Sequence, residues 1–501
     1  MLNVASSLSR GRAQFPHRAA LVFEEKIYSY LELEEMSRRL AHGLYGLGIR
    51  DGERVALLLP NSPEFIVSYF GTLRTGAIAV SISTALATPE IEIILRDSQP
   101  LVLITTRELC LKHNLTDLHP PAKIITVGET PHCESFEQMM SFSSAHQPVS
   151  DMQADSPAAI LYTSGTTGRP KGATLSHGNI LFIGKSKLRY FQTTGMDRLW
   201  VCLPLSHCFA QNAIMNHGLF AGATILLRRE FRQDELWQAI SREHGPTMLF
   251  GVPPYFSILM NSPGGRSSLG SLRFCFSSAA RLPPALAAEW QERFGTIIYE
   301  GYGLTETSPA TFNHETLYKP GSIGTPMQDV EMSIQTFDGH PATQGEPGEV
   351  IIRGPNLMLG YWNSQSRKPD AVEGGWLKTG DVGFIDPDGY FFLTDRLKDM
   401  INVGGLKVYS SEVEDVIRQH PAVLDVAVYG KQDRLMGEIV FATVVPRPGH
   451  NIAKAELISY CQSRLAKFKV PYGIDFRDSI PSSPTGKVLK RVLRNETTPQ
   501  I

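Results

Sequence analysis

Short apolar runs alternate with segments of helical spacing in the first part of this 501-residue chain, and this alternation restricts its fold more than any other feature. The apolar runs have the length of buried strands, and the segments between them carry apolar residues at helical intervals. Parallel strands need a crossover connection, usually a helix, so this rhythm predicts a parallel sheet covered on both faces. The expected strands are Arg54–Leu59, Ala77–Ser83, Leu101–Thr105 and Lys123–Val127, and the expected helices are Pro63–Leu73 and Pro89–Asp97.

The same rhythm returns after a polar, serine-rich stretch at residues 131–154, which we interpret as a linker. No sequence repeat accompanies it, so a second α/β unit of unrelated sequence is predicted. Its expected strands are Leu199–Leu203, Thr224–Leu227, Thr247–Val252, Leu272–Phe276 and Thr296–Tyr299, and its expected helices are Phe231–His244 and Pro284–Phe294.

The pattern changes twice more towards the end of the chain. From Gly321, short β-like pieces stand among glycine, proline and aspartate, which predicts a small β-barrel-like unit. After Arg396 the pieces fit a compact α+β unit of about 100 residues, an ordinary domain size. We therefore predict an α/β fold with a large N-terminal domain at 1–395, a hinge at 396–399 and a small C-terminal domain at 400–501.

Composition excludes several classes of protein. A net charge of −2 gives no reason to expect binding to nucleic acid or to an anionic membrane. The six cysteines form no CxxC pair, so we expect buried thiols in a reducing compartment rather than disulfides or zinc. No run of about 18 apolar residues exists, so no spanning helix is expected. The serine- and arginine-rich N-terminus has weak transit-peptide character, but we interpret it as an ordinary first helix and expect a cytoplasmic protein.

One glycine- and threonine-rich stretch, LYTSGTTGRPKGATLSH, directly follows an apolar run. Glycines let successive backbone N–H groups converge on an anion, and hydroxyls with an ammonium complete a cradle for phosphate oxygens. An ordinary surface turn is the alternative, but the density of these residue types argues against it. The stretch is not a Walker A motif, because Pro170-Lys171-Gly172 replaces Gly-Lys-Ser/Thr. The cradle residues are Thr163, Ser164, Gly165, Thr166, Thr167, Gly168 and Lys171.

Two further segments offer groups that suit a nucleotide. GYGLTETSP follows an expected strand and supplies the Tyr302 ring, the Thr305 hydroxyl and the Glu306 carboxylate. Ligand groups gather at the carboxyl ends of parallel strands, and a carboxylate suits Mg²⁺ beside phosphates. WLKTGD ends in Asp381, whose carboxylate can accept two hydroxyl hydrogen bonds from a ribose diol. Taken alone, GYGLTETSP fits an exposed turn better than a ligand site, and Asp381 also fits an ordinary turn aspartate.

Two charged segments lie near the end of the chain. Thr394–Glu414 is dense in charge and contains Gly404 and Gly405, and Pro481–Arg491 is a proline- and glycine-containing turn that holds Lys487. From the residues alone, the first is a charged linker entering a helix and the second is a basic surface tail.

Together these five segments resemble the motifs of the adenylate-forming enzymes, which include acyl- and aryl-CoA synthetases, peptide-synthetase adenylation domains and beetle luciferases. The resemblance covers nearly the whole chain. It implies an adenylation domain of two α/β subdomains and a β unit, followed by a mobile lid domain. The lack of any GxSxG or Cys/His signature agrees with a reaction that needs no side-chain nucleophile.

The resemblance implies specific catalytic roles. Lys487 would reach between the carboxylate and the α-phosphate, and Lys171 with the loop hydroxyls would hold the departing pyrophosphate. Thr305 would touch the α-phosphate. Glu306 would bind Mg²⁺, with Thr163 as a possible second contact.

The resemblance also implies the contacts to the nucleoside. Tyr302 would stack on adenine, and Asp381 with Arg396 would bind the ribose. The remaining implied nucleotide contacts are Ala279, Ala280, Glu300 and Gly301.

The hinge of the family matches Lys398, where a change of backbone torsion would rotate the C-terminal domain. Gly404 and Gly405 would then line the path of a pantetheine thiol. Ser410 departs from the family, because many acyl-CoA ligases carry proline there, and we interpret this as a mild change in loop stiffness.

His207 lies in the segment that passes the acyl pocket in the family. Its neighbours Cys202 and Cys208 suggest a metal site, but the spacing fits no common zinc pattern. Amino-acid-activating relatives carry an aspartate in this segment, and Leu203–Asn212 contains no acid, which argues against an α-amino acid substrate. The other implied pocket walls are Phe250, Gly251, Val252, Gly301, Gly303 and Leu304, whose glycines we interpret as leaving room for a chain.

The activity that the resemblance implies is ATP-dependent conversion of a fatty or aryl acid into an acyl-adenylate, then transfer to CoA. Three alternatives stay open. In the first, the acyl group is passed to the phosphopantetheine of a separate carrier protein. In the second, the chain is a luciferase-type oxidoreductase. In the third, it is a non-catalytic nucleotide-binding protein. The expected small molecules are ATP, Mg²⁺, a carboxylic acid and CoA, and the sequence leaves monomer and homodimer open.

Overall fold

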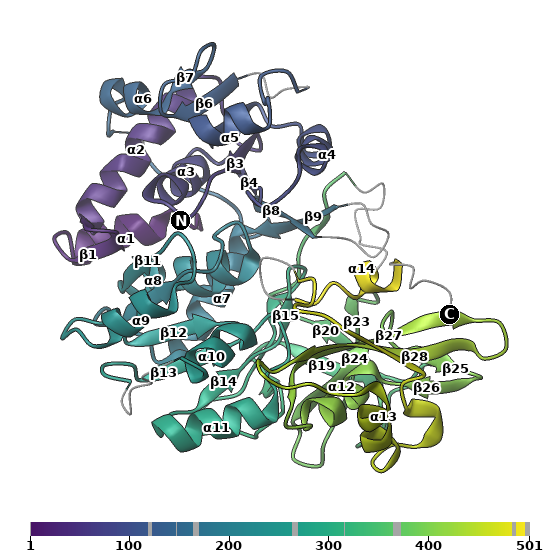
Figure 1. Ribbon diagram of the computed structural model, residues 1–501. Coiled ribbons are helices and arrows are strands. Elements are labelled where there is room, and N and C mark those ends of the chain that lie inside the picture. Colours follow the sequence, from purple (N-terminus) through teal and green to yellow (C-terminus); the bar gives the residue numbers. More distant parts are fainter. Residues whose placement is uncertain are drawn as a thin grey trace.

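The computed structural model describes residues 2–118, 123–146, 148–163, 170–262, 269–314, 316–363, 372–482 and 487–495. Figure 1 shows the N-terminal α/β elements in purple to teal and the β-rich C-terminal part in green to yellow. The elements of the N-terminal part cover two large sheets, and the last part of the chain forms a separate small sheet with its own helices.

The first large sheet has the strand order β21-β9-β8-β4-β3-β5-β6-β7. Its central strands are parallel, as the alternation predicts, whereas β9 and β21 run antiparallel to their neighbours. The strands are β3 (Arg54–Leu58), β4 (Ile78–Ser81), β5 (Val102–Thr106), β6 (Lys123–Val127), β7 (Glu134–Ser135), β8 (Pro157–Thr163), β9 (Lys171–Ser176) and β21 (Gly360–Tyr361). The helices of this part are α2 (Tyr30–Gly46), α3 (Pro63–Arg74), α4 (Thr88–Ser98), α5 (Arg107–Lys112) and α6 (Phe136–Phe142).

The interpretation of residues 131–154 as a linker is wrong for its first half. Phe136 begins helix α6, and Ser135 caps it by accepting a hydrogen bond from the backbone N–H of Gln138. The segment looks polar in sequence because most of its helix faces solvent, while the Phe136 side chain is buried in the main core.

The second large sheet has the order β14-β13-β12-β10-β11-β1-β2. Its far edge comes from the N-terminus, because β1 pairs in parallel with β11. The strands are β1 (Ala19–Phe23), β2 (Lys26–Ser29), β10 (Arg198–Val201), β11 (Thr224–Leu227), β12 (Met248–Gly251), β13 (Phe274–Ser277) and β14 (Ile298–Glu300). The helices here are α1 (Ser6–Gln14), α7 (His177–Phe191), α8 (His217–Ala221), α9 (Gln233–Ile240), α10 (Pro253–Met260) and α11 (Pro284–Phe294).

A π-helix, η1 (Phe209–Asn216), leads from the His207 segment into α8. All of its residues are buried. Single π-type turns are rare and often occur at functional sites, so this element draws attention to the space around it.

The β unit follows two short ribbons. Its strands follow the order β19-β20-β23-β22, and β24 pairs with the second half of the long strand β23. The strands are β15 (Gly303–Leu304), β16 (Ser308–Pro309), β17 (Thr311–Phe312), β18 (Thr325–Pro326), β19 (Glu331–Gln335), β20 (Gly348–Arg353), β22 (Val372–Glu373), β23 (Trp376–Ile385) and β24 (Phe391–Arg396).

The last part of the chain forms a small α+β unit with a core of its own, which runs from Ile401 to Ile474. Its sheet has the order β26-β25-β28-β27, and β29 pairs with β28. The elements are β25 (Ile401–Val403), β26 (Leu406–Val408), α12 (Ser410–Arg418), β27 (Val423–Asp433), β28 (Gly437–Pro446), α13 (Lys454–Gln462), the 3₁₀ turn η2 (Lys467–Lys469), β29 (Gly473–Phe476) and α14 (Lys490–Asn495).

These observations confirm the predicted fold class, an α/β chain with a large N-terminal and a small C-terminal domain. The N-terminal segment forms the ordinary helix α1, and the Val4 backbone N–H donates to Nδ1 of His177 at 3.1 Å. Within the described residues, none of the helices has both the length and the apolar character needed to cross a membrane.

Candidate active site

The phosphate-loop stretch joins two neighbouring strands of the first sheet. Thr163 ends β8 and lies opposite Lys171 at the start of β9, and the Thr163 hydroxyl donates to the Lys171 carbonyl at 3.5 Å. Of the predicted cradle, Ser164, Gly165, Thr166, Thr167 and Gly168 lie outside the described residues. The two described members thus stand at the two ends of the loop, on adjacent strands.

Lys171 and Glu306 meet at a tyrosine that sequence analysis missed. The Tyr361 hydroxyl donates to Oε1 of Glu306 at 2.8 Å, and Nζ of Lys171 lies 5.1 Å from the centre of the Tyr361 ring. Burial and the Glu306 charge raise the pKa of Tyr361, so its hydroxyl stays protonated and acts as a donor. Thr305 is half-buried beside Glu306.

Tyr361 reaches this position because β21 returns to the first sheet and pairs with β9. A short GYW stretch has no motif character, so only the pairing identifies it.

The predicted nucleoside contacts form a second cluster. The Tyr302 hydroxyl donates to Oδ2 of Asp381 at 2.6 Å, and Nε of Arg396 lies 3.0 Å from Oδ1 of the same carboxylate. Asp381 and Arg396 are directly opposite each other on β23 and β24, so the sheet register fixes their pairing. Burial, and then the Asp381 charge, raises the pKa of Tyr302 well above its ordinary value.

Lys487 lies at the edge of this second cluster. Burial lowers its pKa to about 8, and the charges of Arg396 and Asp381 also act on it. Burial and the Lys487 charge lower the pKa of His207 to about 4, so that imidazole is neutral at pH 7. The C-terminal segment is therefore folded against the N-terminal domain, with its lysine close enough to Asp381 and to His207 for their charges to interact.

The segment after β13 passes the carboxyl end of β14. The Ser278 hydroxyl donates to the Gly301 carbonyl at 2.9 Å, and Ala279 has a φ of 69°, a left-handed conformation that is unusual for a residue with a Cβ. The buried Glu300 carboxylate accepts a hydrogen bond from the Leu282 N–H at 2.9 Å, and burial raises its pKa to about 7. Ala280 is half-buried in the same turn.

The predicted acid-pocket residues lie against a cluster of phenylalanine rings. Phe250 and Val252 are buried, and the Phe250 ring lies 6.1 Å from that of Phe276 and 5.7 Å from that of Phe191. Gly251 ends β12 beside them, and Leu304 packs against the same core.

The free space expected beside two of the glycines is already filled. A Cβ on Gly301 would come within 2.6 Å of the Phe276 ring, and one on Gly303 within 2.0 Å of the Ser308 carbonyl oxygen. The interpretation that these glycines leave room for a chain is therefore wrong in this arrangement. They permit close packing of the β15–β16 ribbon and of the phenylalanine cluster instead.

The contacts that hold the C-terminal domain in this arrangement include one ion pair to the N-terminal domain and one to the predicted hinge. Nη1 of Arg281 lies 2.7 Å from Oδ2 of Asp415, which connects the segment after β13 to α12. Arg494 of α14 donates to the Lys398 carbonyl at 3.1 Å and lies 3.0 Å from the Asp399 carboxylate. Lys398 itself lies in the turn that follows β24.

Gly404 and Gly405 form the turn between β25 and β26, with φ of 59° and 90°. Two consecutive positive φ values are those of a tight hairpin turn that favours glycine. The Gly404 N–H donates to the Met436 carbonyl at 2.7 Å, so in this arrangement the described contacts of the turn lie within the C-terminal domain rather than with Asp381 or Lys487.

Sequence analysis also missed Lys187, a fully buried lysine on α7. It was overlooked because the helix that carries it, α7, was not among the predicted helices. The sequence pattern that could have identified it is a lone lysine at an apolar position of a helix. Lys185, two residues earlier, lies on the exposed face of the same helix.

Comparisons with known proteins agree with this geometry. The family model described as "AMP-binding enzyme" matches residues 8–362, and the one described as "AMP-binding enzyme C-terminal domain" matches residues 412–487. Feruloyl-CoA synthase from an Amycolatopsis species is 34% identical over 96% of this chain and 96% of its own length. A long-chain-fatty-acid–CoA ligase from Bacillus subtilis is 33% identical over 98% of this chain and 94% of its own.

Among solved structures, ATP-bound MatB from Rhodopseudomonas palustris superposes with a TM-score of 0.90 at 31% identity, covering 98% of each chain. The apo form of the same enzyme superposes with a TM-score of 0.80. The whole chain thus superposes better on the ATP-bound form than on the apo form. The chain belongs to the AMP-binding enzyme family and, through it, to the adenylate-forming superfamily of acyl-CoA synthetases.

Proposed function

We propose that this enzyme joins a carboxylic acid to the AMP part of ATP and then transfers the acyl group to the thiol of CoA. The observation that carries the proposal is the convergence of Tyr302, Asp381, Arg396 and Lys487 from separate segments at the boundary of the two domains. The relatives named above are acid–CoA ligases, and their similarity over nearly the whole chain supports the same two-step reaction.

The first step needs charge stabilisation rather than a nucleophilic side chain. The acid's carboxylate oxygen attacks the α-phosphorus, the bond to the bridging oxygen breaks, and pyrophosphate leaves. Negative charge gathers on the phosphorus in the transition state, so cations placed in advance lower the barrier. In the proposed roles, Lys487 lies between the carboxylate and the α-phosphate, and Lys171 with the loop holds the pyrophosphate.

The carboxylate of Glu306 fits a magnesium ion beside the phosphates. Oxygen ligands are those that Mg²⁺ prefers, and it commonly keeps one or two carboxylates together with substrate phosphates. Oε1 of Glu306 is held by the Tyr361 hydroxyl, and no described residue forms an ion pair with this carboxylate. Glu306, with Thr163 nearby, would hold the ion, which would neutralise phosphate charge. Among the described residues there is no cluster of three His, Cys, Asp or Glu side chains suited to a metal.

The second step needs a different arrangement of the lid. Lys487 lies within electrostatic reach of Asp381 and His207, while the Gly404-Gly405 turn contacts its own domain. In the proposal, a rotation at Lys398 withdraws Lys487 and brings that turn to the acyl-adenylate. The thiolate of CoA then attacks the acyl carbon, and AMP leaves as the acyl carbon–oxygen bond breaks.

A panel of aryl and fatty acids in an acid-dependent exchange of labelled pyrophosphate into ATP tests the first step. Mass spectrometry of the products with CoA, or with a phosphopantetheinylated carrier protein in its place, tests the second. We expect exchange with one class of acid and an acyl-CoA product. No exchange with any acid would contradict the proposal. Thioester formation only on the carrier protein would show that the carrier, rather than CoA, accepts the acyl group.

A further inference from the structure

Lys187 lies completely buried beside aromatic rings, with the buried His217 and Cys208 close enough to interact with its charge. It comes from the last turns of α7, and its Nζ donates to the Ala213 carbonyl of the π-helix η1 at 3.0 Å. The same Nζ lies 5.2 Å from the centre of the Phe191 ring and 5.7 Å from that of Phe312. No role in the nucleotide reaction accounts for an amine in this place.

Within the described part of the chain, no carboxylate forms an ion pair with this lysine. Burial lowers the pKa of Lys187 well below its ordinary value, and the nearby Cys208 thiol opposes this only in part. An amine has more hydrogen-bonding capacity than one acceptor can use, and a buried polar group with unused capacity is costly. A ligand atom that uses this capacity would recover the cost.

The lysine stands on the acid side of the site. Lys487 lies close enough to His207 to lower its pKa, and the next residue, Cys208, is close enough to affect Lys187. Lys187 also lies against the Phe191 ring, which is 5.7 Å from the ring of Phe250, a predicted wall of the acid pocket. An acid in that pocket would have Lys187 at its apolar end.

Aromatic rings surround this far end. The Phe191 ring lies 5.0 Å from that of Phe276 and 4.8 Å from that of Phe312, in tilted and edge-on geometries. Such rings favour a flat aromatic ligand by offset and edge contacts. The Cys208 thiol and Ser308 hydroxyl, 3.4 Å apart, add polar atoms at the same place.

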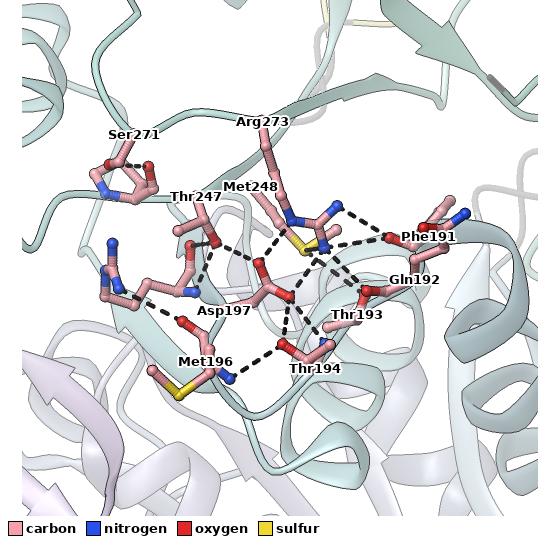
Figure 2. Close-up of polar contacts among 12 residues, drawn as sticks. Phe191, Gln192, Thr193, Thr194, Met196, Asp197, Thr247, Met248, Ser271 and Arg273 are labelled. Carbon is pink, nitrogen blue, oxygen red and sulfur yellow. Dashed lines mark hydrogen bonds and ion pairs between the residues drawn. The ribbon is translucent and has the colours of Figure 1, made fainter.

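The end of α7 is held firmly, so Lys187 has a fixed position. Arg273 donates to the Phe191 carbonyl at 3.3 Å and forms two contacts of 2.9 Å with the Asp197 carboxylate, as Figure 2 shows. Asp197 also accepts a hydrogen bond from the Thr247 hydroxyl at 2.8 Å. This network ties the helix end to the starts of β10, β12 and β13. A preorganised donor discriminates between ligands better than a mobile one.

We propose that Lys187 is a specificity-determining residue, and that its amine forms a hydrogen bond with an oxygen substituent on the ring of an aromatic carboxylic acid. The inference rests on the function proposed above and names its substrate class. It requires that the enzyme distinguishes two acids that differ only in the ring oxygen, and that this distinction depends on Lys187.

The test compares kcat/KM for acid-dependent pyrophosphate release with benzoate against 4-hydroxybenzoate and with cinnamate against 4-hydroxycinnamate. We expect the native enzyme to prefer the hydroxylated member of at least one pair by about tenfold or more, the scale of one buried hydrogen bond to a polar group. Lys187→Met should remove that preference while changing the rate with the unsubstituted acid little. Lys185→Met, on the exposed face of the same helix, is the matched control and should leave both rates unchanged.

A spectroscopic measurement distinguishes binding of the ring oxygen by Lys187 from a purely structural role of Lys187 in supporting η1. Binding of 4-hydroxycinnamate to the native enzyme should shift its ultraviolet absorbance, and Lys187→Met should abolish the shift. Lys187→Gln, which keeps an N–H donor, should retain part of the preference and serves if the methionine variant does not fold. Equal losses for both members of each pair would assign Lys187 to bracing the π-helix and overturn the inference. Activity with alkyl acids alone would also overturn it while leaving the proposed ligase function intact, whereas no activity with any acid would instead contradict that function.

Discussion

The proposed nucleotide side and the proposed acid side of the site are built in opposite ways. On the nucleotide side, polar groups from distant segments meet, as the Tyr302 hydroxyl, the Asp381 carboxylate and the Arg396 guanidinium do. On the acid side, phenylalanine rings pack against one another beside the buried amine of Lys187. The first side contains most of the charge and the second most of the apolar surface.

The difference has a physical reason. ATP presents the same phosphates, ribose and base in every reaction, so its contacts need fixed residue types. The acid is recognised mainly by shape, and many apolar combinations fill the same volume. Changes on the nucleotide side should therefore affect all acids alike, whereas changes on the acid side should separate one acid from another.

The largest effect is expected for Lys487→Ala. Loss of a cation aimed at the developing charge should slow acid-dependent pyrophosphate exchange by about 10²- to 10³-fold, by a similar factor for every acid. The thiolysis of a supplied acyl-adenylate should continue. Arg491→Ala, an exposed change in the same segment, is the control. Equal loss of both half-reactions would refute the assigned role.

The second substitution, Lys398→Pro, tests the proposed hinge. If torsion here moves the lid, overall acyl-CoA formation should fall by roughly a hundredfold, the scale expected when reacting groups are misplaced. Pyrophosphate exchange should persist, because the present arrangement already holds Lys487 near Asp381. Lys398→Ala removes the side chain but leaves the torsion free and is the control. An unimpaired overall rate would exclude the hinge.

The pH dependence sharpens the comparison. Burial lowers the pKa of Lys487 to about 8, so its ammonium is present below pH 8 and lost above it. The exchange kcat/KM should fall about tenfold per pH unit above that value, whichever acid is used. The closed arrangement binds fewer protons than an open one with an ordinary lysine, so rising pH favours closure, and lid opening does not explain the loss. The Lys487→Arg variant should lack this inflection in its pH profile, whatever its rate. An unchanged inflection would show that a group other than Lys487 titrates there.

Tyr361→Phe removes the 2.8 Å hydrogen bond that orients Glu306. Hydrogen bonds to charged groups are worth about 1.5–3 kcal/mol, so we expect exchange to slow by about tenfold or more, again for all acids. A titration of Mg²⁺ at fixed ATP should show the loss as weaker apparent metal affinity. Tyr45→Phe, exposed on α2, is the control. A normal magnesium titration would show that Tyr361 has no part in holding Glu306.

The smallest effect is expected for Asp415→Asn, which breaks the 2.7 Å contact with Arg281 between the domains. Partly exposed ion pairs contribute about 0.2–1 kcal/mol, so exchange should fall by at most about fivefold. Thiolysis should not fall with it, because the contact belongs to the present arrangement of the lid. Asp478→Asn, exposed in the same domain, is the control. A parallel fall in both half-reactions would show that the pair serves only stability.

Sequence analysis reached the nucleotide side more completely than the acid side. Tyr302, Asp381, Arg396 and Lys487 were all named from their segments, and the structure brings them together. The glycine-rich cradle itself lies outside the described residues and stays a prediction. Tyr361 was missed, since its place depends on the pairing of β21 with β9, more than 180 residues earlier in the chain.

The acid side was predicted only in part. Phe250 and Val252 were named, but the surrounding rings and Lys187 were not, and the space expected beside Gly301 and Gly303 is filled by their neighbours. Residue type says that a phenylalanine is buried, but only packing says which rings touch and which volume they leave.

By itself, the sequence determined the α/β class and the order of the domains and offered the residues proposed for ATP, because strand periodicity and polar side-chain chemistry are local properties. Only the tertiary structure decided that β1 joins the second sheet, that β21 returns to the first, and that the lid places Lys487 beside Asp381. Those outcomes depend on contacts between segments far apart in the chain, where hydrophobic burial and strand pairing among many candidate partners select one arrangement.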